Sequence, residues 1–252
     1  MFKIKSLCVA AFAVNLVACV TSSPSSNSEM QAQYDKAIQL YQNKQYAEAQ
    51  TLLKPLAEQG FADAQFNLGS MYYFGRGMPQ NPNEALKWYR KAAEQGLDAA
   101  QFNLANAYNY GDGIKQDFTE AAKWYQKAAT QGMMEARTNL GILYENGTGV
   151  AQDYKKALDL YHQASQQGDA VADFAIGNLY RQGKGVAADS TTAFKWFKQS
   201  AEKGYPIAQY NLGVSYYKGD GVAADRKSAK MWYEKACQSG LEQSCLAAKS
   251  VK

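Results

Sequence analysis

The sequence predicts an all-α protein, a right-handed α/α superhelical solenoid of tandem helix-turn-helix repeats. Three observations predict this class. Similar stretches recur every 36 residues, among them AQFNLGSMYYFGRG, AQFNLANAYNYGDG and AQYNLGVSYYKGDG. Apolar residues follow helical spacing inside each repeat, and a pair of glycines separates one apolar stripe from the next. A period of this length is typical of repeat proteins, in which each unit buries its apolar face against its neighbours.

Each repeat contains the pattern of two helices. In the first repeat one stripe lies at i, i+4 and i+8 and is made by Ala64, Leu68 and Tyr72. A second stripe lies at i, i+3, i+4 and i+7 and is made by Ala85, Trp88, Tyr89 and Ala92. We expect all the tryptophans at the position of Trp88 in the core, namely Trp88, Trp124, Trp196 and Trp232.

Residues that end and begin helices stand between the stripes. Every link has two glycines, which reach positive φ at little cost: Gly75 and Gly77, Gly111 and Gly113, Gly147 and Gly149, Gly183 and Gly185, and Gly219 and Gly221. A helix N-cap residue follows each link: Asn81, Asp117, Asp153, Asp189 and Asp225. A further glycine, such as Gly96, turns the chain into the next repeat.

The chain therefore divides into a leader and one repeat domain over residues 30–252. Five full repeats cover 62–97, 98–133, 134–169, 170–205 and 206–241. Residues 30–61 form a variant N-terminal unit without the G-x-G link, and residues 242–252 form a single C-terminal capping helix. This division predicts thirteen helices.

The repeats resemble the Sel-one-like repeat (SLR), a relative of the tetratricopeptide repeat. The resemblance covers five repeats of 36 residues, or 180 of the 252 residues. It implies a solenoid whose first helices line a concave groove and a protein that acts as an adaptor. Residues 30–61 resemble an ordinary tetratricopeptide unit and are expected to cap the N-terminal end.

Residues 1–18 are typical of a secretory signal. Lys3 and Lys5 precede an apolar run over 7–17, eleven residues long. As a helix this run would rise only about 17 Å, too little for a hydrocarbon core of about 30 Å, so a transmembrane anchor is the weaker interpretation. Removing the leader reduces 27 basic residues to 25, against 23 acidic ones. This balance gives no reason to expect nucleic acid or an anionic membrane surface as a partner.

The leader ends in Leu-Val-Ala-Cys at residues 16–19, which resembles a bacterial lipobox. The resemblance implies cleavage before Cys19 and attachment of lipid to its thiol. The alternative is an incidental thiol behind a cleaved signal, which is unusual in a secreted protein. The Ser-rich segment 19–29 is expected to be a flexible tether. Because Val20 is not acidic, the resemblance favours the periplasmic face of the outer membrane.

No pattern indicates an active site. The single histidine, His162, aligns with polar residues of the other repeats, so we expect it on a solvated face and expect no metal site. The G-x-G links complete neither phosphate-loop pattern and are interpreted as turns. We also expect no serine activated in the Ser-x-x-Lys manner. The chain is therefore predicted not to be an enzyme and to need no cofactor.

Cys237 and Cys245 flank the last turn between repeats. Adjacent antiparallel helices could bring the two within disulfide distance. Cysteine-rich secreted SLR proteins have a similar eight-residue spacing, which implies the same pairing here. Two unpaired thiols are the alternative, and a redox-active pair is less favoured because no C-x-x-C motif occurs.

The candidate binding surface is the face of each first helix opposite its apolar stripe. In tetratricopeptide proteins this face lines a groove that holds peptides, and here it is rich in aromatic and Asn side chains, which suit contact with an extended chain. The candidate groove residues are Phe66, Asn67, Tyr73, Phe74, Phe102, Asn103, Asn106, Tyr110, Asn139, Arg181, Tyr210, Asn211 and Tyr217. Whether the aromatics at the fifth position of the repeat, such as Phe66, bind a partner or only pack stays open.

These features predict a lipid-anchored periplasmic adaptor or inhibitor that docks a protein or peptide in its groove. Some lipid-anchored SLR proteins that resemble this chain are immunity proteins against secreted phospholipase effectors, which is one specific form of this hypothesis. The alternative is a β-lactam-binding or β-lactamase-like protein, as certain cysteine-rich SLR proteins are, although only one of their Cys pairs is present. A purely structural envelope protein is the third interpretation.

Overall fold

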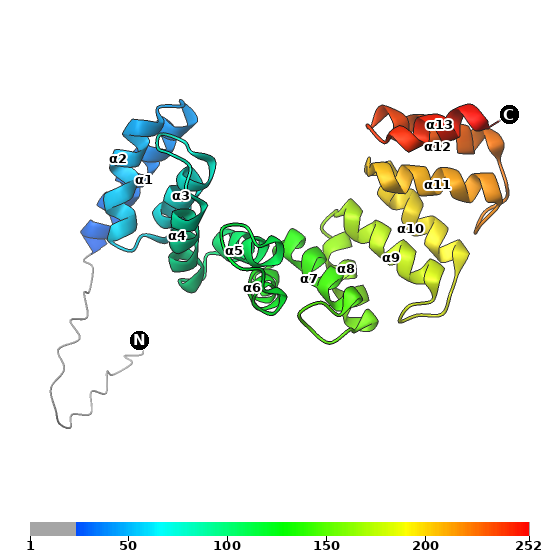
Figure 1. The fold of residues 1–252 in the computed structure, drawn as a ribbon, viewed down its shortest axis with the longest axis horizontal. Coiled ribbons are helices and arrows are strands. Elements are labelled where there is room, and N and C mark those ends of the chain that lie inside the picture. The colour runs from blue at the N-terminus through cyan, green and yellow to red at the C-terminus, as the bar shows by residue number, and fades with distance from the viewer. Residues whose placement is uncertain (1–23, 252) are drawn as a thin grey trace, which may run out of the picture.

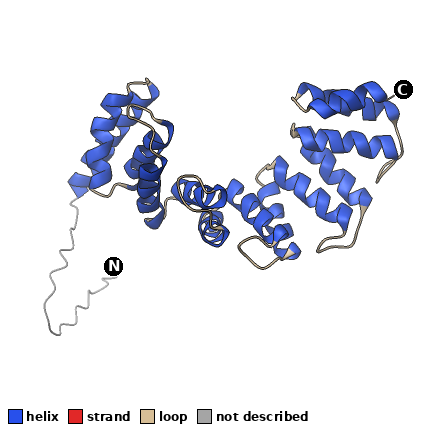
Figure 2. Ribbon diagram, in the orientation of Figure 1, coloured by secondary structure: helices blue, strands red, loops and turns tan. Residues whose placement is uncertain are grey.

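The computed structural model describes residues 24–251, which form thirteen α-helices and no strand. Short loops join the helices throughout this part of the chain (Figure 2). The helices are α1 (Pro24–Gln42), α2 (Tyr46–Glu58), α3 (Ala62–Phe74), α4 (Pro82–Glu94), α5 (Asp98–Tyr110), α6 (Phe118–Thr130), α7 (Met134–Asn146), α8 (Tyr154–Ser165), α9 (Ala170–Gln182), α10 (Ser190–Glu202), α11 (Pro206–Lys218), α12 (Arg226–Gln238) and α13 (Glu242–Ser250). The all-α class and the number of helices are confirmed.

The residues predicted to begin and end helices do so. Each second helix of a repeat begins after its predicted N-cap, whose side chain accepts a backbone N–H; Asn81 Oδ1 accepts from Glu84 N at 3.1 Å. Each first helix ends at a glycine in the left-handed region, as at Gly75 with φ 66°. The second glycine of a link also permits close approach, because a Cβ added at Gly149 would lie 2.3 Å from the carbonyl carbon of Phe118.

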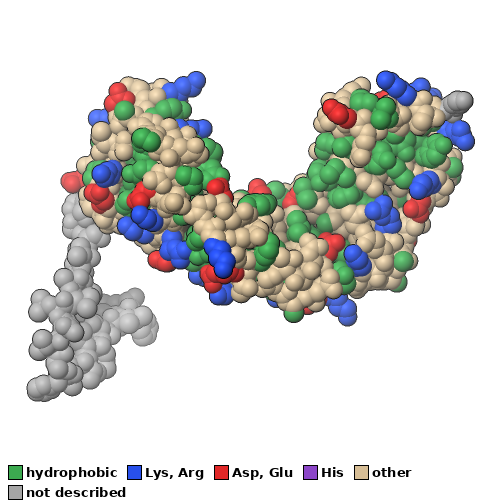
Figure 3. Space-filling view, in the orientation of Figure 1, with side chains coloured by type: hydrophobic (Ala, Val, Ile, Leu, Met, Phe, Trp, Pro, Cys, Tyr) green, Lys and Arg blue, Asp and Glu red, His purple; other side chains and the backbone are tan. Residues whose placement is uncertain are grey.

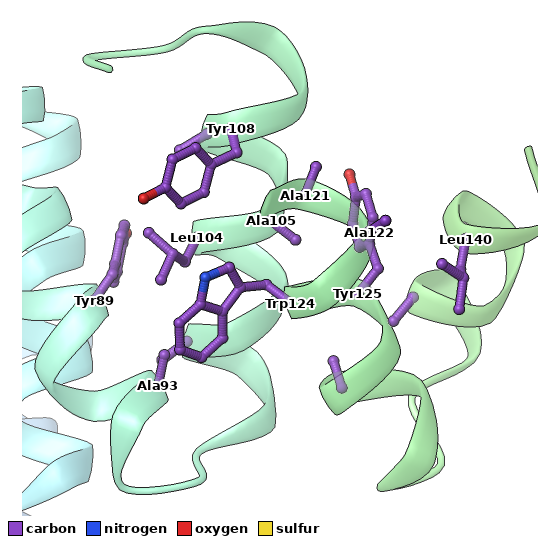
Figure 4. Close-up of a cluster of buried hydrophobic side chains, with 14 of the residues drawn as sticks. Tyr89, Ala93, Leu104, Ala105, Tyr108, Ala121, Ala122, Trp124, Tyr125 and Leu140 are labelled. Atoms are coloured by element: carbon purple, nitrogen blue, oxygen red, sulfur yellow. The ribbon is translucent and has the colours of Figure 1, made fainter. Parts of the chain in front are cut away.

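A core of apolar side chains joins the repeats to one another. Helices α4 to α8 contribute to one cluster of buried residues. Figure 4 shows Leu104 of α5 pointing toward Tyr89 of α4 and Trp124 of α6, with Leu140 of α7 on the far side of Tyr125. Burial of apolar surface contributes about 25 cal/mol per Å², so this cluster stabilises the stack of repeats.

Trp196 differs from the expectation for the tryptophans. Trp88, Trp124 and Trp232 are buried, each under the ammonium group of the Lys three residues later, as Lys91 lies 4.2 Å from the Trp88 ring centroid. Trp196 has Gln199 three residues later in place of Lys, and Gln199 donates to Asp173. The Trp196 indole is only partly buried. His162 packs edge-on against this indole at 5.3 Å and is half-buried, so it is less exposed than a fully solvated side chain.

The described chain forms an open U (Figures 1 and 3). Helices α1–α4 make one limb, α11–α13 make the other, and the repeats between them form the base. In the base, α5 lies on the side of the opening and α6 on the outer side. Figure 3 shows a hollow between the limbs with hydrophobic side chains along its walls. None of the helices in residues 24–251 has both the length and the apolar character needed to cross a membrane.

The leader, Cys19 and the first residues of the expected tether lie outside the described residues. Helix α1 begins at Pro24, inside the segment 19–29 for which the sequence predicts a tether. A proline is well suited to the first turn of a helix, because its missing N–H would have no partner there. The signal segment and the lipid on Cys19 stay predictions.

Candidate functional site

Three aromatic side chains of the candidate groove are largely exposed. They stand at the ends of first helices, where α3, α5 and α11 meet their links. Phe74 is 58% exposed, Tyr110 70% and Tyr217 44%. Exposed rings of this size are available to a partner without any rearrangement of the core.

The aromatics at the fifth position of the repeat, candidates or not, pack inside their own repeats. Each ring is partly buried and lies tilted against an aromatic ring of the second helix, an arrangement that stabilises beyond the area buried. The ring pairs are Phe66–Tyr89 at 5.6 Å, Phe102–Tyr125 at 5.9 Å, Phe174–Phe197 at 5.5 Å and Tyr210–Tyr233 at 5.5 Å between centroids. These rings therefore help to join the two helices of each repeat.

Hydrogen bonds within the chain engage several of the candidate Asn side chains. Asn67 Nδ2 donates to the Tyr34 hydroxyl at 2.7 Å, and Asn106 Oδ1 accepts from the Tyr125 hydroxyl at 2.5 Å. Burial raises the pKa of Tyr125 well above its usual range and keeps this hydroxyl protonated, although a hydrogen bond with Asn139 lowers it. The Asn residues thus link neighbouring helices as well as facing the groove.

A pocket of about 250 Å³ opens between the first two full repeats. It brings together five of the candidate groove residues with side chains from α4 and from the link after α5. The lining residues are Tyr73, Phe74, Leu86, Tyr89, Asn103, Asn106, Ala107, Tyr110 and Asp112. The walls are mostly aromatic and aliphatic, with a few polar groups, as in sites that bind organic ligands or side chains.

Asp112 is the charged residue of this pocket lining. The Tyr73 hydroxyl donates to Asp112 Oδ2 at 2.5 Å, and this hydrogen bond raises the pKa of Tyr73. Asp112 is not among the residues that the sequence pattern places in the groove. The available signal was that the residue between the two link glycines varies in charge from repeat to repeat: Arg76, Asp112, Thr148, Lys184 and Asp220.

Arg181 lies away from this pocket, between the fourth and fifth repeats. Its Nη2 donates to Asn178 Oδ1 at 2.8 Å and its Nη1 to Asn211 Oδ1 at 3.1 Å. The guanidinium carbon lies 5.3 Å from the centroid of the Phe197 ring. The candidate residues therefore do not form one site: five line the pocket, and Arg181 and Asn211 form a separate contact.

Two Ser-x-x-Lys spacings do occur in the chain, at Ser200 and Lys203 and at Ser215 and Lys218, so that expectation was wrong about the motif. Ser215 is only 5% exposed. Ser200 is 0% exposed, and its hydroxyl donates to the carbonyl oxygen of Ala170 at 2.6 Å. Lys203 Nζ lies 2.6 Å from Asp173 Oδ2. Both serines are thus closed to substrate and Lys203 is paired elsewhere, an arrangement unsuited to nucleophilic catalysis.

Within residues 24–251, no group of three or more His, Cys, Asp or Glu side chains could hold a metal ion. Cys237 of α12 and Cys245 of α13 form a disulfide, with a Cα–Cα distance of 4.9 Å. This bond ties the last helix to the repeat before it.

The sequence model of the Sel1 repeat family matches residues 62–97, 98–133, 135–169, 170–205 and 206–241. These matches span most of the chain and follow the five helix pairs. No match was found among curated proteins.

Solved structures share the fold. A Sel1 repeat protein from Oxalobacter formigenes is 38% identical, with a TM-score of 0.81 and 86% of each chain covered. The Escherichia coli protein c5321, described as a protective antigen of uropathogenic strains, is 32% identical with a TM-score of 0.83, and the match covers 89% of this chain and 49% of that one. The chain thus spans about half the length of c5321. The Pseudomonas aeruginosa immunity protein PA5088 is 22% identical, with a TM-score of 0.51, and 84% of this chain and 81% of that one are covered.

Proposed function

The chain belongs to the Sel1 repeat family, and we propose that it acts as a non-enzymatic scaffold that binds a protein partner on its concave side. Solenoids of stacked helix pairs offer extended concave surfaces of the kind that bind protein chains. The observation that carries the proposal is the exposure of Phe74 and Tyr110 beside a pocket lined by Asn and aromatic side chains. Such rings provide large contact areas at a small entropic cost.

We also propose that the protein works at the periplasmic face of the outer membrane, anchored by lipid on Cys19. The proposal rests on the lipobox-like residues 16–19 behind an apolar run. Replacing Cys19 by Ser should release the protein from the membrane fraction. A Cys19→Ser protein that stays with the membranes after its signal is removed would contradict the anchor.

A finer proposal is that the partner is a secreted phospholipase effector and that the protein inhibits it. The support is the sequence resemblance to lipid-anchored SLR immunity proteins; PA5088 adds only a shared fold. Co-expression with such an effector tests this form directly. Survival of the cells that depends on Phe74 and Tyr110 would support it, whereas equal killing with and without the protein would exclude that effector.

The β-lactam alternative has less support, because Ser200 is buried and bonded to the backbone. This alternative would be supported if the purified protein hydrolysed nitrocefin and if one side-chain substitution abolished that hydrolysis.

The scaffold proposal is tested by chemical cross-linking and affinity capture of the anchored protein from its native envelope. The test variant is Phe74→Ala/Tyr110→Ala, which removes exposed rings and leaves the packed ring of Phe102 in place. The control is Lys123→Ala, which changes an exposed side chain of α6 on the outer side. We expect partner recovery to fall about tenfold in the test variant only, as for a loss of about 1.4 kcal/mol in binding. Equal recovery in the wild type and both variants would refute the proposal.

A further inference from the structure

We infer that the pocket between the first two full repeats binds a cationic side chain of the partner, arginine above all. The inference rests on the proposed function, because it names the chemistry that the concave side recognises. The first observation is the negative charge of the pocket lining. Asp112 is the charged lining residue, and among residues 24–251 no Lys or Arg forms an ion pair with it. Tyr73 donates to Asp112 Oδ2 only, which leaves Oδ1 to accept from a ligand.

The repeat itself shows how a guanidinium fits at this place. Between the fourth and fifth repeats, Arg181 lies over the ring of Phe197 and donates to Asn211 Oδ1. Counted along the repeat, Phe197 corresponds to Tyr89 and Asn211 to Asn103. Tyr89 and Asn103 both line the pocket between the first two repeats.

The residue that corresponds to Arg181 in the first repeat is Tyr73. Its hydroxyl is bonded to Asp112, and its ring lies edge-on to Phe74 at 5.0 Å. The chain therefore supplies no cation of its own to this pocket, although ring, amide and carboxylate are all present. An arginine from a partner would take the place that Arg181 takes near the other end of the solenoid.

The apolar walls suit the rest of such a side chain. Leu86, Ala107 and the rings of Phe74 and Tyr110 line the pocket and can cover the aliphatic stem of an arginine or lysine. Arg76 lies beside one of these walls: its guanidinium carbon is 5.0 Å from the Phe74 centroid. Its Nη1 donates to the Tyr41 hydroxyl, and Arg76 is not a lining residue, so it does not fill the pocket.

The corresponding places at the other boundaries lack this combination. At the position of Asp112 the next two repeats have Thr148 and Lys184, and the first has Arg76. Asp220 restores the carboxylate in the last repeat, but there Arg181 stands where Tyr73 stands in the first. One cationic side chain at one fixed place in the bound segment is therefore expected.

The test is selection of a random, unstructured peptide library displayed on phage, with the complete repeat domain as target. The wild type should select peptides with Arg, or less strongly Lys, at one fixed position, and Asp112→Asn should lose that preference. The matched control is Asp220→Asn, which removes the same charge from the equivalent link of the last repeat and should keep the preference.

The best selected peptide is then synthesised with Arg and with citrulline, its uncharged isostere. Binding is measured by fluorescence anisotropy. Replacing Arg by citrulline should weaken binding about tenfold in the wild type and in Asp220→Asn, because the charge-assisted hydrogen bond to Asp112 and the cation–π contact are lost. The same replacement should have little effect in Asp112→Asn, because that variant has already lost the interaction with the charge. Equal binding of both peptides to the wild type would overturn the inference while leaving the scaffold proposal intact. A library that yields no peptide dependent on Phe74 and Tyr110 would also overturn it, and the envelope capture described above would decide the scaffold proposal separately.

Discussion

Lys203, at the surface of the fourth repeat, forms an ion pair with the buried Asp173, with Lys203 Nζ 2.6 Å from Asp173 Oδ2. The carboxylate is completely buried, and its Oδ1 accepts from Gln199 at 3.0 Å. The contact at Oδ2 lies outside hydrogen-bond geometry and is therefore ionic. In the first two repeats the same two positions are glutamines that bond to each other: Gln95 to Gln65 at 2.7 Å and Gln131 to Gln101 at 2.9 Å.

This pairing predicts that Lys203→Met destabilises the protein strongly. The variant leaves the Asp173 carboxylate buried without its cation, which typically costs about 3–5 kcal/mol. The double variant Asp173→Gln/Lys203→Gln restores the pair found in the first repeats and should stay within about 1 kcal/mol of the wild type. Urea unfolding of the three proteins measures this. A single variant as stable as the wild type would show that the pair contributes nothing.

A second prediction concerns the close contact of the two helices in the fourth repeat. A Cβ added at Gly177 would lie 2.6 Å from Phe197 Cε1, so Gly177→Ala should destabilise by about 1–3 kcal/mol. Adding Phe197→Leu to this variant should cost less than it costs in the wild type, because the smaller side chain makes room for the methyl group. Additive losses of stability in this double-mutant cycle would refute the steric explanation.

The helix N-caps predict how stability changes in acid. Hydrogen bonds from Thr192 and Ser228 lower the pKa values of Asp189 and Asp225 below the usual 3.8. The folded state therefore binds fewer protons than the unfolded state near these pKa values. The stability that the two groups contribute is complete above about pH 3.8 and is lost as the pH falls through the folded-state pKa values.

The variant Asp189→Asn/Asp225→Asn tests this dependence. Asn caps a helix about as well as Asp but does not titrate in this range. The urea midpoint of the variant should fall less than that of the wild type between pH 5 and pH 2, measured by circular dichroism. Parallel curves for the two proteins would contradict the assignment.

The disulfide predicts a local effect on the last helix. A bridge that closes a loop of eight residues restricts the unfolded chain by about 2.5 kcal/mol. In Cys237→Ser/Cys245→Ser, the amides of α13 should exchange with solvent about 10 to 100 times faster, whereas those of α5 and α6 should be unchanged. Hydrogen exchange measured by mass spectrometry distinguishes this from general destabilisation, in which both regions would accelerate together.

The helices could be predicted from the sequence because local residues decide them. Gly75 ends a helix through its own backbone, and Asn81 begins one through its own side chain. The helix boundaries of each repeat can therefore be predicted from these residue types alone. The exposed candidates Phe74 and Tyr110 were found by the same counting along a helix.

The remaining features depend on pairs of residues from different helices. Asp112 lines the pocket only because the link after α5 meets the end of α3. Trp196 is partly exposed, and Gln199 donates to Asp173; neither could be predicted from the spacing of residues in the sequence. The start of α1 inside a Ser-rich segment was missed because composition alone favours a flexible chain there.

Site-specific photo-cross-linking in the native envelope tests the scaffold proposal most directly. A photoreactive amino acid replaces Tyr110 in one protein and Lys123, on the outer side of the same repeat, in the other. We predict that irradiation joins a discrete partner protein to position 110 and that the same partner is absent from position 123. Cross-linking of one partner at both positions, or at position 123 alone, would contradict binding on the concave side.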